Sequence, residues 1–246
     1  MKPLIISFAT DPPDSSFYRK AAVNLKAQCD AHGMECVIET MRGDSWLANT
    51  RRKPAFILEH LLDLKGPVLW VDVDSRLCRP IDLDPPALCD IGVCKFNDAR
   101  EKFLIYGVGT LLFRYTALSI ELLEEWAMCC SWPTAHPDHH WFEVARRTTE
   151  RRYPELSVWT MPRTYSWHKD WTPDAREDDE PIISVRVSQV KSKRHYIQQM
   201  KGLRDEHAYR ELLFRSAGGA ELLYPPCREA EGAVCRFRDT LSDSPA

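Results

Sequence analysis

The chain has 246 residues, of which 44% are hydrophobic and 28% charged, and its formal net charge is −3. These values are ordinary for a globular protein with a buried core, and they exclude a protein that binds nucleic acid through overall positive charge. No run approaches the roughly 18 apolar residues of a membrane helix, so we expect no membrane partner. Nine cysteines without a Cys-x-x-Cys pair or a leading signal peptide indicate reduced thiols in a cytoplasmic protein.

The first part of the chain alternates between predicted strands and helices. Apolar runs predict strands, and helical spacing of apolar residues predicts helices. The strands are expected at 4–9, 35–40 and 68–71, and the helices at 17–32 and 54–64. Short connections between these elements favour a parallel, doubly wound α/β sheet.

Two carboxylates, Asp72 and Asp74, directly follow the strand expected at 68–71. Ligands bind at the carboxyl ends of the strands in open α/β sheets. Alternate residues of an extended chain point the same way, so both carboxylates can face one point if the backbone stays extended. Two hard oxygen ligands suit Mg²⁺ or Mn²⁺, which commonly bridge substrate phosphates. The plainer interpretation of an Asp-x-Asp sequence is a solvated turn or a helix cap.

The usual phosphate-binding loops are absent from the sequence. No Gly-x-x-x-x-Gly-Lys-Ser/Thr is present, and Gly107-Val108-Gly109 lacks the third glycine of a dinucleotide fingerprint. A P-loop protein and an NAD-binding protein are therefore excluded.

The second part of the chain continues the alternation. Thr116 is expected to cap a helix, residues 167–180 are expected to form a loop, and residues 225–246 are expected to be loosely held. The further strands are expected at 91–96, 109–113, 158–161 and 182–187, and the further helices at 117–130, 138–149 and 203–215.

Three segments in this order resemble motifs of the nucleotide-diphospho-sugar transferases with the GT-A glycosyltransferase fold, above all their small bacterial and phage members. Residues 68–74 look like the family's strand with its DxD motif, and residues 107–114 are similar to a glycine-containing strand of the family. Asp138 stands where the family often has an acidic residue that opens a helix. The likeness covers roughly residues 4–190.

The resemblance implies a single domain with a Rossmann-like, mostly parallel sheet flanked by helices. This domain would span residues 1–215, with a donor-nucleotide half at about 1–100 and an acceptor half at about 101–215. Residues 216–246 would form a C-terminal tail. The donor would be a nucleotide-diphospho-sugar, with a UDP-sugar expected, and Mn²⁺ or Mg²⁺ would assist.

The resemblance also implies roles for individual residues, each at its own position in this sequence. Asp138 would act in catalysis, as the base or as a stabiliser of the sugar cation, and Asp72 and Asp74 would bind the metal. Asp72 would alternatively contact the ribose of the donor. The remaining residues of the donor site would be Ala9, Thr10 and Tyr18 at the base, Arg52, Lys53, Lys191 and Lys193 at the diphosphate, and Gly109 at the sugar or acceptor.

Plainer interpretations stand beside these roles. Tyr18 can simply pack at a helix start, the basic residues can belong to solvated faces, and Asp138 can be an N-cap. Residues 107–110 can form a tight turn before a strand. The histidines at 136, 139 and 140 are expected to be structural or exposed.

The sequence leaves the acceptor and two other classes of function open. A metal-dependent nucleotidyltransferase or phosphohydrolase also uses paired aspartates, and a non-catalytic module can bind a nucleotide sugar. Residues 146–215 carry 15 Lys and Arg against 11 Asp and Glu, interleaved with aromatic residues. Such a segment can grip an anionic acceptor, so a hydroxymethylated DNA base stands beside a glycan or a small molecule.

Overall fold

The computed structural model describes residues 2–11, 16–95, 106–132, 136–167 and 181–184. The chain divides into two compact units, Met1–Tyr196 and Ile197–Ala246, and every described residue belongs to the first. The predictions for residues 168–180, 185–187 and 203–215, for the tail, and for Lys191 and Lys193 lie outside the described residues.

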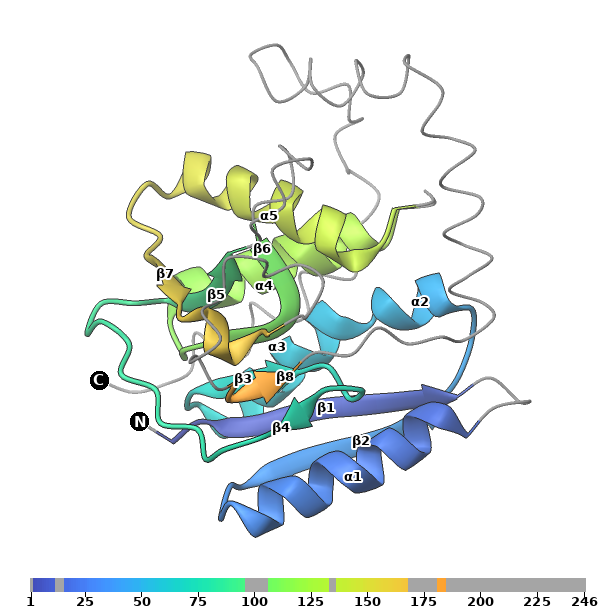
Figure 1. Ribbon diagram of the computed structural model, residues 1–246. Coiled ribbons are helices and arrows are strands. Elements are labelled where there is room, and N and C mark those ends of the chain that lie inside the picture. Colours follow the sequence, from blue (N-terminus) through green and yellow to red (C-terminus); the bar gives the residue numbers. More distant parts are fainter. Residues whose placement is uncertain (1, 12–15, 96–105, 133–135, 168–180, 185–246) are drawn as a thin grey trace. The chain divides into compact units, whose positions relative to one another are not determined.

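A six-stranded sheet in the order β2-β1-β3-β6-β5-β7 forms the centre of the first unit (Figure 1). Strand β6 is antiparallel to both of its neighbours, and the other neighbouring strands are parallel. The expected α/β class with a mostly parallel sheet is therefore confirmed. The strands are β1 (Leu4–Asp11), β2 (Cys36–Arg42), β3 (Val68–Val71), β5 (Ile91–Lys95), β6 (Tyr106–Phe113) and β7 (Val158–Met161).

Four of the predicted helices are present, and the structure adds one short helix. Thr116 caps α4 as expected, because its side chain accepts a hydrogen bond from the backbone N–H of Ser119. Gly33 follows α1 with a φ of +62°, a conformation that favours glycine. The helices are α1 (Phe17–Ala31), α2 (Trp46–Thr50), α3 (Lys53–Leu64), α4 (Ala117–Cys130) and α5 (Asp138–Arg152).

Two hydrophobic cores cover the two faces of the sheet. On one face, side chains of α3, α4 and α5 pack against Trp70 and Phe113. On the other face, α1 packs with Leu69 and Leu112, together with residues of the segment that follows β3. The alternation of β3 between Trp70 on one side and Leu69 on the other explains why all four of its residues are buried.

Two details differ from the sequence prediction. Residues 107–109 belong to β6, which begins at Tyr106, so the alternative of a tight turn at this position is wrong. These residues extend because they continue the ladder beside β3 and β5. A second, two-stranded sheet pairs β4 (Arg76–Leu77) with β8 (Ile183–Ser184), and a 3-10 turn, η1, spans Arg163–Tyr165.

In the part of the chain that the structure describes, no helix is long and apolar enough to cross a bilayer.

Candidate functional site

The Asp72–Asp74 segment turns immediately after β3. Residues 73 and 74 lie in a turn that is closed by a 2.9 Å hydrogen bond from the Ser75 N–H to the Asp72 carbonyl. The condition for both carboxylates to face one point, a backbone that stays extended, is therefore not met. Both aspartates are half-buried, whereas Val73 between them is buried against Ala9 and Ala22. The turn is thus anchored by its central apolar side chain.

Asp72 is held by contacts with β3, α3 and β6. Its Oδ1 accepts a 2.9 Å hydrogen bond from the indole N–H of Trp70 and lies 3.0 Å from the ammonium of Lys53. Its backbone N–H donates to the carbonyl of Gly109 at 2.8 Å. Trp70 and Asp72 stand two residues apart, so the strand brings them to the same side. One carboxylate oxygen of Asp72 is therefore engaged inside the protein.

Lys53 forms the centre of a buried charge cluster. Its Nζ lies 3.0 Å from Asp72 and 2.7 Å from Asp138, and it donates to the carbonyl of Val108 at 3.1 Å. Its ammonium is thus surrounded by two carboxylates and one backbone carbonyl. Burial alone would lower the pKa of Lys53, but the two carboxylates outweigh burial and raise it. Lys53 stays a cation, and we call Lys53, Asp72 and Asp138 the lysine cluster.

Asp138 opens α5 but does not cap it. The N-cap residue is Pro137, and the Asp138 carboxylate is turned to Lys53 instead of to the free N–H groups of the helix. The N-cap interpretation is therefore wrong. Burial alone would raise the pKa of this carboxyl, but Lys53 and His139 hold it at about 2. The backbone carbonyl of Asp138 accepts a 2.9 Å hydrogen bond from the indole of Trp126, which fixes the start of the helix.

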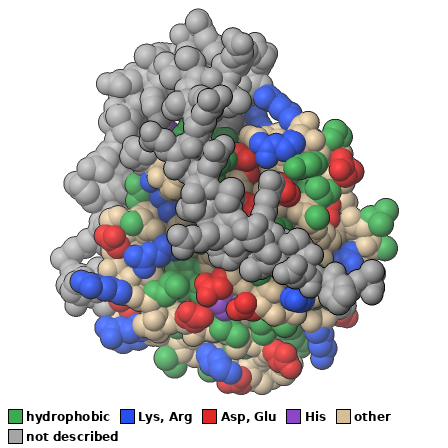
Figure 2. Space-filling model, turned by 180° about the vertical axis from the view of Figure 1, so that it is seen from behind, with side chains coloured by type: hydrophobic (Ala, Val, Ile, Leu, Met, Phe, Trp, Pro, Cys, Tyr) green, Lys and Arg blue, Asp and Glu red, His purple; other side chains and the backbone are tan. Residues whose placement is uncertain are grey.

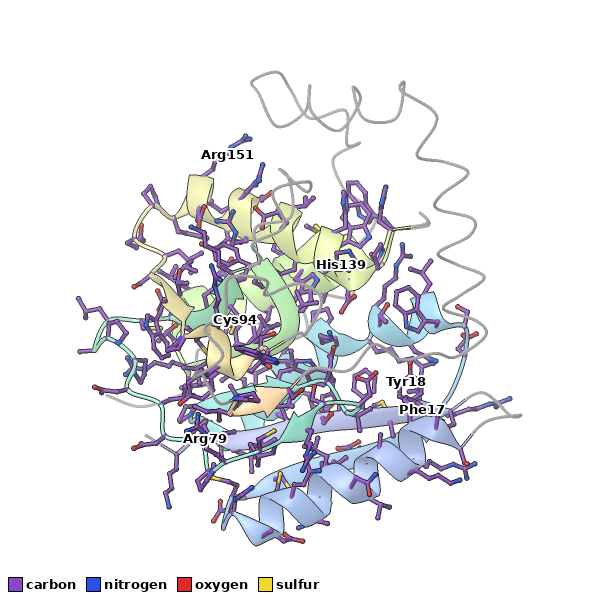
Figure 3. The ribbon with its side chains drawn as sticks, in the orientation of Figure 1. Phe17, Tyr18, Arg79, Cys94, His139 and Arg151 are labelled. Atoms are coloured by element: carbon purple, nitrogen blue, oxygen red, sulfur yellow. The ribbon has the colours of Figure 1, made fainter. Side chains whose placement is uncertain are left out.

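The end of β1 supplies the residues expected at the nucleotide base. Ala9 and Thr10 are buried, and half-buried Tyr18 packs against the small core that contains Ala9 and Val73. Tyr18 at the start of α1 and His139 at the start of α5 both lie at the end of the sheet toward which β1 points (Figure 3). The structure thus brings Tyr18 to the neighbourhood of the Asp72–Asp74 turn through Val73.

Asp11 occupies the N-terminus of α1. Its carboxylate accepts hydrogen bonds from the backbone N–H groups of Tyr18 at 2.7 Å and Arg19 at 2.8 Å. A helix N-terminus attracts anions, and here a protein carboxylate takes that place. A diphosphate at this edge of the sheet needs another source of positive charge.

Two further predicted residues lie apart from the carboxylates of the lysine cluster. The guanidinium of Arg52 donates to the carbonyl of Arg42 at 2.7 Å, at the end of β2. Gly109 is part of β6 and reaches the cluster only through its carbonyl, which binds the backbone of Asp72. Among the described residues, no group of three or more His, Cys, Asp and Glu could hold a metal.

The sequence interpretation missed the residues that hold the start of α5. No role was predicted for Arg51, yet its guanidinium binds the carbonyls of Trp132 and His136. The rings of His136 and His140 are buried and stacked, with centroids 4.0 Å apart. The one available signal was the run of three basic residues, 51–53, directly before an apolar helix.

Part of the basic segment expected at an anionic acceptor is engaged internally. Glu143 is buried and binds both Arg146, at 2.6 Å, and Arg147, at 2.7 Å. Arg146 also pairs with Glu150 and lies over the ring of Tyr106. On the face shown in Figure 2, acidic and basic side chains alternate over the described surface.

Neither a protein-family model nor a curated protein sequence matches this chain. Among solved structures, the fold is similar to that of a glycosyltransferase involved in the glycosylation of the major capsid of PBCV-1. The TM-score is 0.55 at 13% sequence identity, and the likeness covers 80% of this chain and 100% of that one. The chain therefore has a fold that is found in a glycosyltransferase.

Proposed function

We propose that this chain is a glycosyltransferase of the GT-A type, which moves a sugar from a UDP-sugar to an acceptor hydroxyl. The observation that carries the proposal is the lysine cluster: Lys53 joins Asp72, after β3, to Asp138, at the start of α5. The cluster lies beside an Asp-x-Asp turn at the carboxyl end of a strand, where α/β sheets bind ligands. The fold likeness to a glycosyltransferase supports the same reaction class.

The carboxylates of the Asp72–Asp74 turn fit a divalent cation in kind, since Mn²⁺ and Mg²⁺ prefer oxygen ligands. Trp70 and Lys53 engage Oδ1 of Asp72, so we assign the second oxygen of Asp72 to the cation, together with the carboxylate of Asp74. When bound, the cation would neutralise negative charge on the diphosphate leaving group. Lys191 and Lys193 are proposed to add positive charge there.

The donor would lie along the carboxyl edge of β1 and β3. Tyr18 would stack on the nucleotide base, as its half-buried position beside Val73 allows. Ala9 and Thr10 would shape the backbone wall of this pocket. We assign no diphosphate contact to the N-terminus of α1, because Asp11 already occupies it.

Asp138 is proposed to stabilise positive charge and not to act as a base. Sugar transfer develops positive charge at the anomeric carbon. A carboxylate with a pKa of about 2 is a weak proton acceptor at neutral pH, because an efficient base has a pKa near the working pH. The same carboxylate stays ionised throughout the reaction, which suits electrostatic stabilisation.

Donor hydrolysis tests the proposal. The protein is incubated with a panel of UDP- and GDP-hexoses, with and without Mn²⁺, and released nucleotide and sugar are measured. We expect slow, cation-dependent release of UDP from one UDP-hexose. Turnover of nucleoside triphosphates would instead favour a nucleotidyltransferase or phosphohydrolase. Binding of a nucleotide sugar without hydrolysis or transfer would instead favour a non-catalytic binding module.

A further inference from the structure

Arg51 binds the backbone on the approach to α5 with its whole guanidinium. Nε and Nη2 donate to the carbonyl of His136 at 3.0 and 2.7 Å, and Nη1 donates to the carbonyl of Trp132 at 2.9 Å. A planar guanidinium with several fixed donors holds its acceptors in a defined orientation. Both carbonyls belong to the approach to Asp138, which follows His136 by two residues.

Arg51 and Lys53 stand two residues apart at the junction of α2 and α3, and they hold the same target at two points. Arg51 binds the backbone just before α5, and Lys53 binds the Asp138 carboxylate at 2.7 Å. Arg52, between them, is directed to the carbonyl of Arg42. One short junction thus binds both the backbone of His136, just before α5, and the first carboxylate of α5.

We propose that Arg51 is a positioning residue that acts through Asp138. This inference rests on the proposed glycosyltransferase function. The guanidinium of Arg51 binds the carbonyl of His136, two residues before Asp138, so we expect its effect to pass through the backbone of residues 136–138. Among the described residues, the charged and titratable groups that face Asp138 are Lys53 from α3, Cys130 from the end of α4 and His139 from α5 itself.

This role predicts a particular kinetic signature. The donor nucleotide would be held by β1 and the Asp72–Asp74 turn, whereas the guanidinium of Arg51 binds the carbonyls of Trp132 and His136. We therefore expect donor affinity to change little when Arg51 is replaced. The orientation of Asp138 toward the anomeric carbon should change, and with it the turnover number. An interaction that is made only in the transition state lowers kcat without raising KM.

The experiment measures donor hydrolysis for Arg51→Gln, alone and combined with Asp138→Asn, on the UDP-hexose that the wild-type protein hydrolyses. We expect kcat to fall about tenfold or more with KM for the donor within about twofold, and no further fall in the Asp138→Asn background. Arg51→Lys keeps the positive charge but loses the planar guanidinium with its several fixed donors. This variant replaces Arg51→Gln in the experiment if Arg51→Gln does not fold.

Arg114→Gln is the matched control. Arg114 also binds backbone carbonyls, those of Ala87 and Cys89, but near the start of β5. Arg114→Gln should lower the stability of the protein but should not lower kcat selectively, as Arg51→Gln is expected to do. Equal losses of kcat in the wild-type and Asp138→Asn backgrounds would overturn the proposal, as would a loss confined to KM.

Hydrogen exchange supplies a readout that does not need activity. In Arg51→Gln, amides at the start of α5 should exchange faster, while those of β1 and β3 keep their protection. Unchanged exchange at residues 136–141 would overturn the positioning role. If the wild-type protein hydrolyses no donor, the proposed function fails, and exchange alone then decides whether Arg51 positions the start of α5.

Discussion

The ammonium of Lys53 lies 2.7 Å from the carboxylate of Asp138, and the side chain of each residue is only 5% exposed. A buried ion pair of this kind is costly to desolvate, and it persists only where further hydrogen bonds satisfy the remaining groups. Here Asp72 and the carbonyl of Val108 supply them. The cluster holds two carboxylates and one ammonium, so removing the cation leaves the buried anion of Asp138 close to the half-buried anion of Asp72.

Lys53→Met should therefore be more damaging than the loss of either carboxylate. Stranding a buried charge costs about 3–5 kcal/mol, and here the two anions also repel each other. We expect the free energy of unfolding, measured with urea at pH 7, to fall by about this amount and donor hydrolysis to be lost.

The double variant Lys53→Met/Asp138→Asn supplies the control for that interpretation. Neutralising Asp138 removes one of the two stranded anions, so the double variant should be more stable than Lys53→Met alone. Equal or lower stability of the double variant would contradict the charge-cluster explanation.

Asp138→Asn on its own should lower turnover by about 100-fold with little change in nucleotide affinity, because the variant keeps the shape of the side chain and loses its charge. The stability loss should be moderate, since Lys53 keeps its contacts with Asp72 and Val108. Turnover and donor affinity are measured by hydrolysis and by calorimetry with UDP. Near-normal turnover would leave Asp138 with a purely structural role.

Asp74→Ala should abolish cation-dependent nucleotide binding and preserve the fold, because the residue lies in a half-buried turn outside the core. Thermal shift with UDP, with and without Mn²⁺, measures this directly. Asp84→Ala is the matched control, since it removes an exposed aspartate from the loop that follows. A Mn²⁺-dependent shift that survives in Asp74→Ala would assign the cation to another residue.

The sequence predicts the elements of this fold where a local pattern is long enough. The bounds of β3, α4 and β7 are those expected from apolar runs, helical spacing and the Thr116 cap. Helix α2 has five residues and β4 has two, and neither length can carry a periodic signal. Strand β4 exists because β8, far along the chain, pairs with it.

The candidate site shows the same limit more sharply. Asp72, Asp138 and Lys53 were each candidates on local grounds, but each also had an ordinary local explanation. Their meeting depends on how α3 packs over β3 and α5 over the neighbouring β6, and no local pattern carries that information. Arg51 was missed for the same reason, since its partners are backbone carbonyls, whose position no residue type reveals.

The buried histidine pair predicts loss of stability in mild acid. Burial, Arg51 and His139 lower the pKa of His136 to about 4, and burial and the neighbouring histidines lower that of His140 to about 3. In the unfolded chain both titrate at about 6.5. Between about pH 6.5 and 4 the unfolded state binds more protons, so stability is full above this window and falls as pH drops through it.

Urea unfolding at several pH values measures this effect. Each histidine contributes up to about 1.4 kcal/mol per pH unit within the window. His136→Gln removes one of the two, so the stability of this variant should fall less steeply between about pH 6.5 and 5 than that of the wild-type protein. If stability falls equally steeply with pH in the variant and in the wild-type protein, folding does not lower the pKa of His136.

The acceptor prediction concerns charge. Arg146 and Arg147 are bound to buried Glu143, and on the described surface in Figure 2 acidic side chains stand among the basic ones. A DNA acceptor needs several unpaired basic side chains, and its binding then weakens steeply with salt. We therefore expect no binding of hydroxymethylated duplex DNA tighter than about 100 μM at about 150 mM salt, with or without UDP and Mn²⁺.

Fluorescence anisotropy across a salt series measures the DNA affinity, and transfer to a panel of neutral glycans is tested in parallel. Tight binding with a steep salt slope would instead favour the modified DNA base as acceptor.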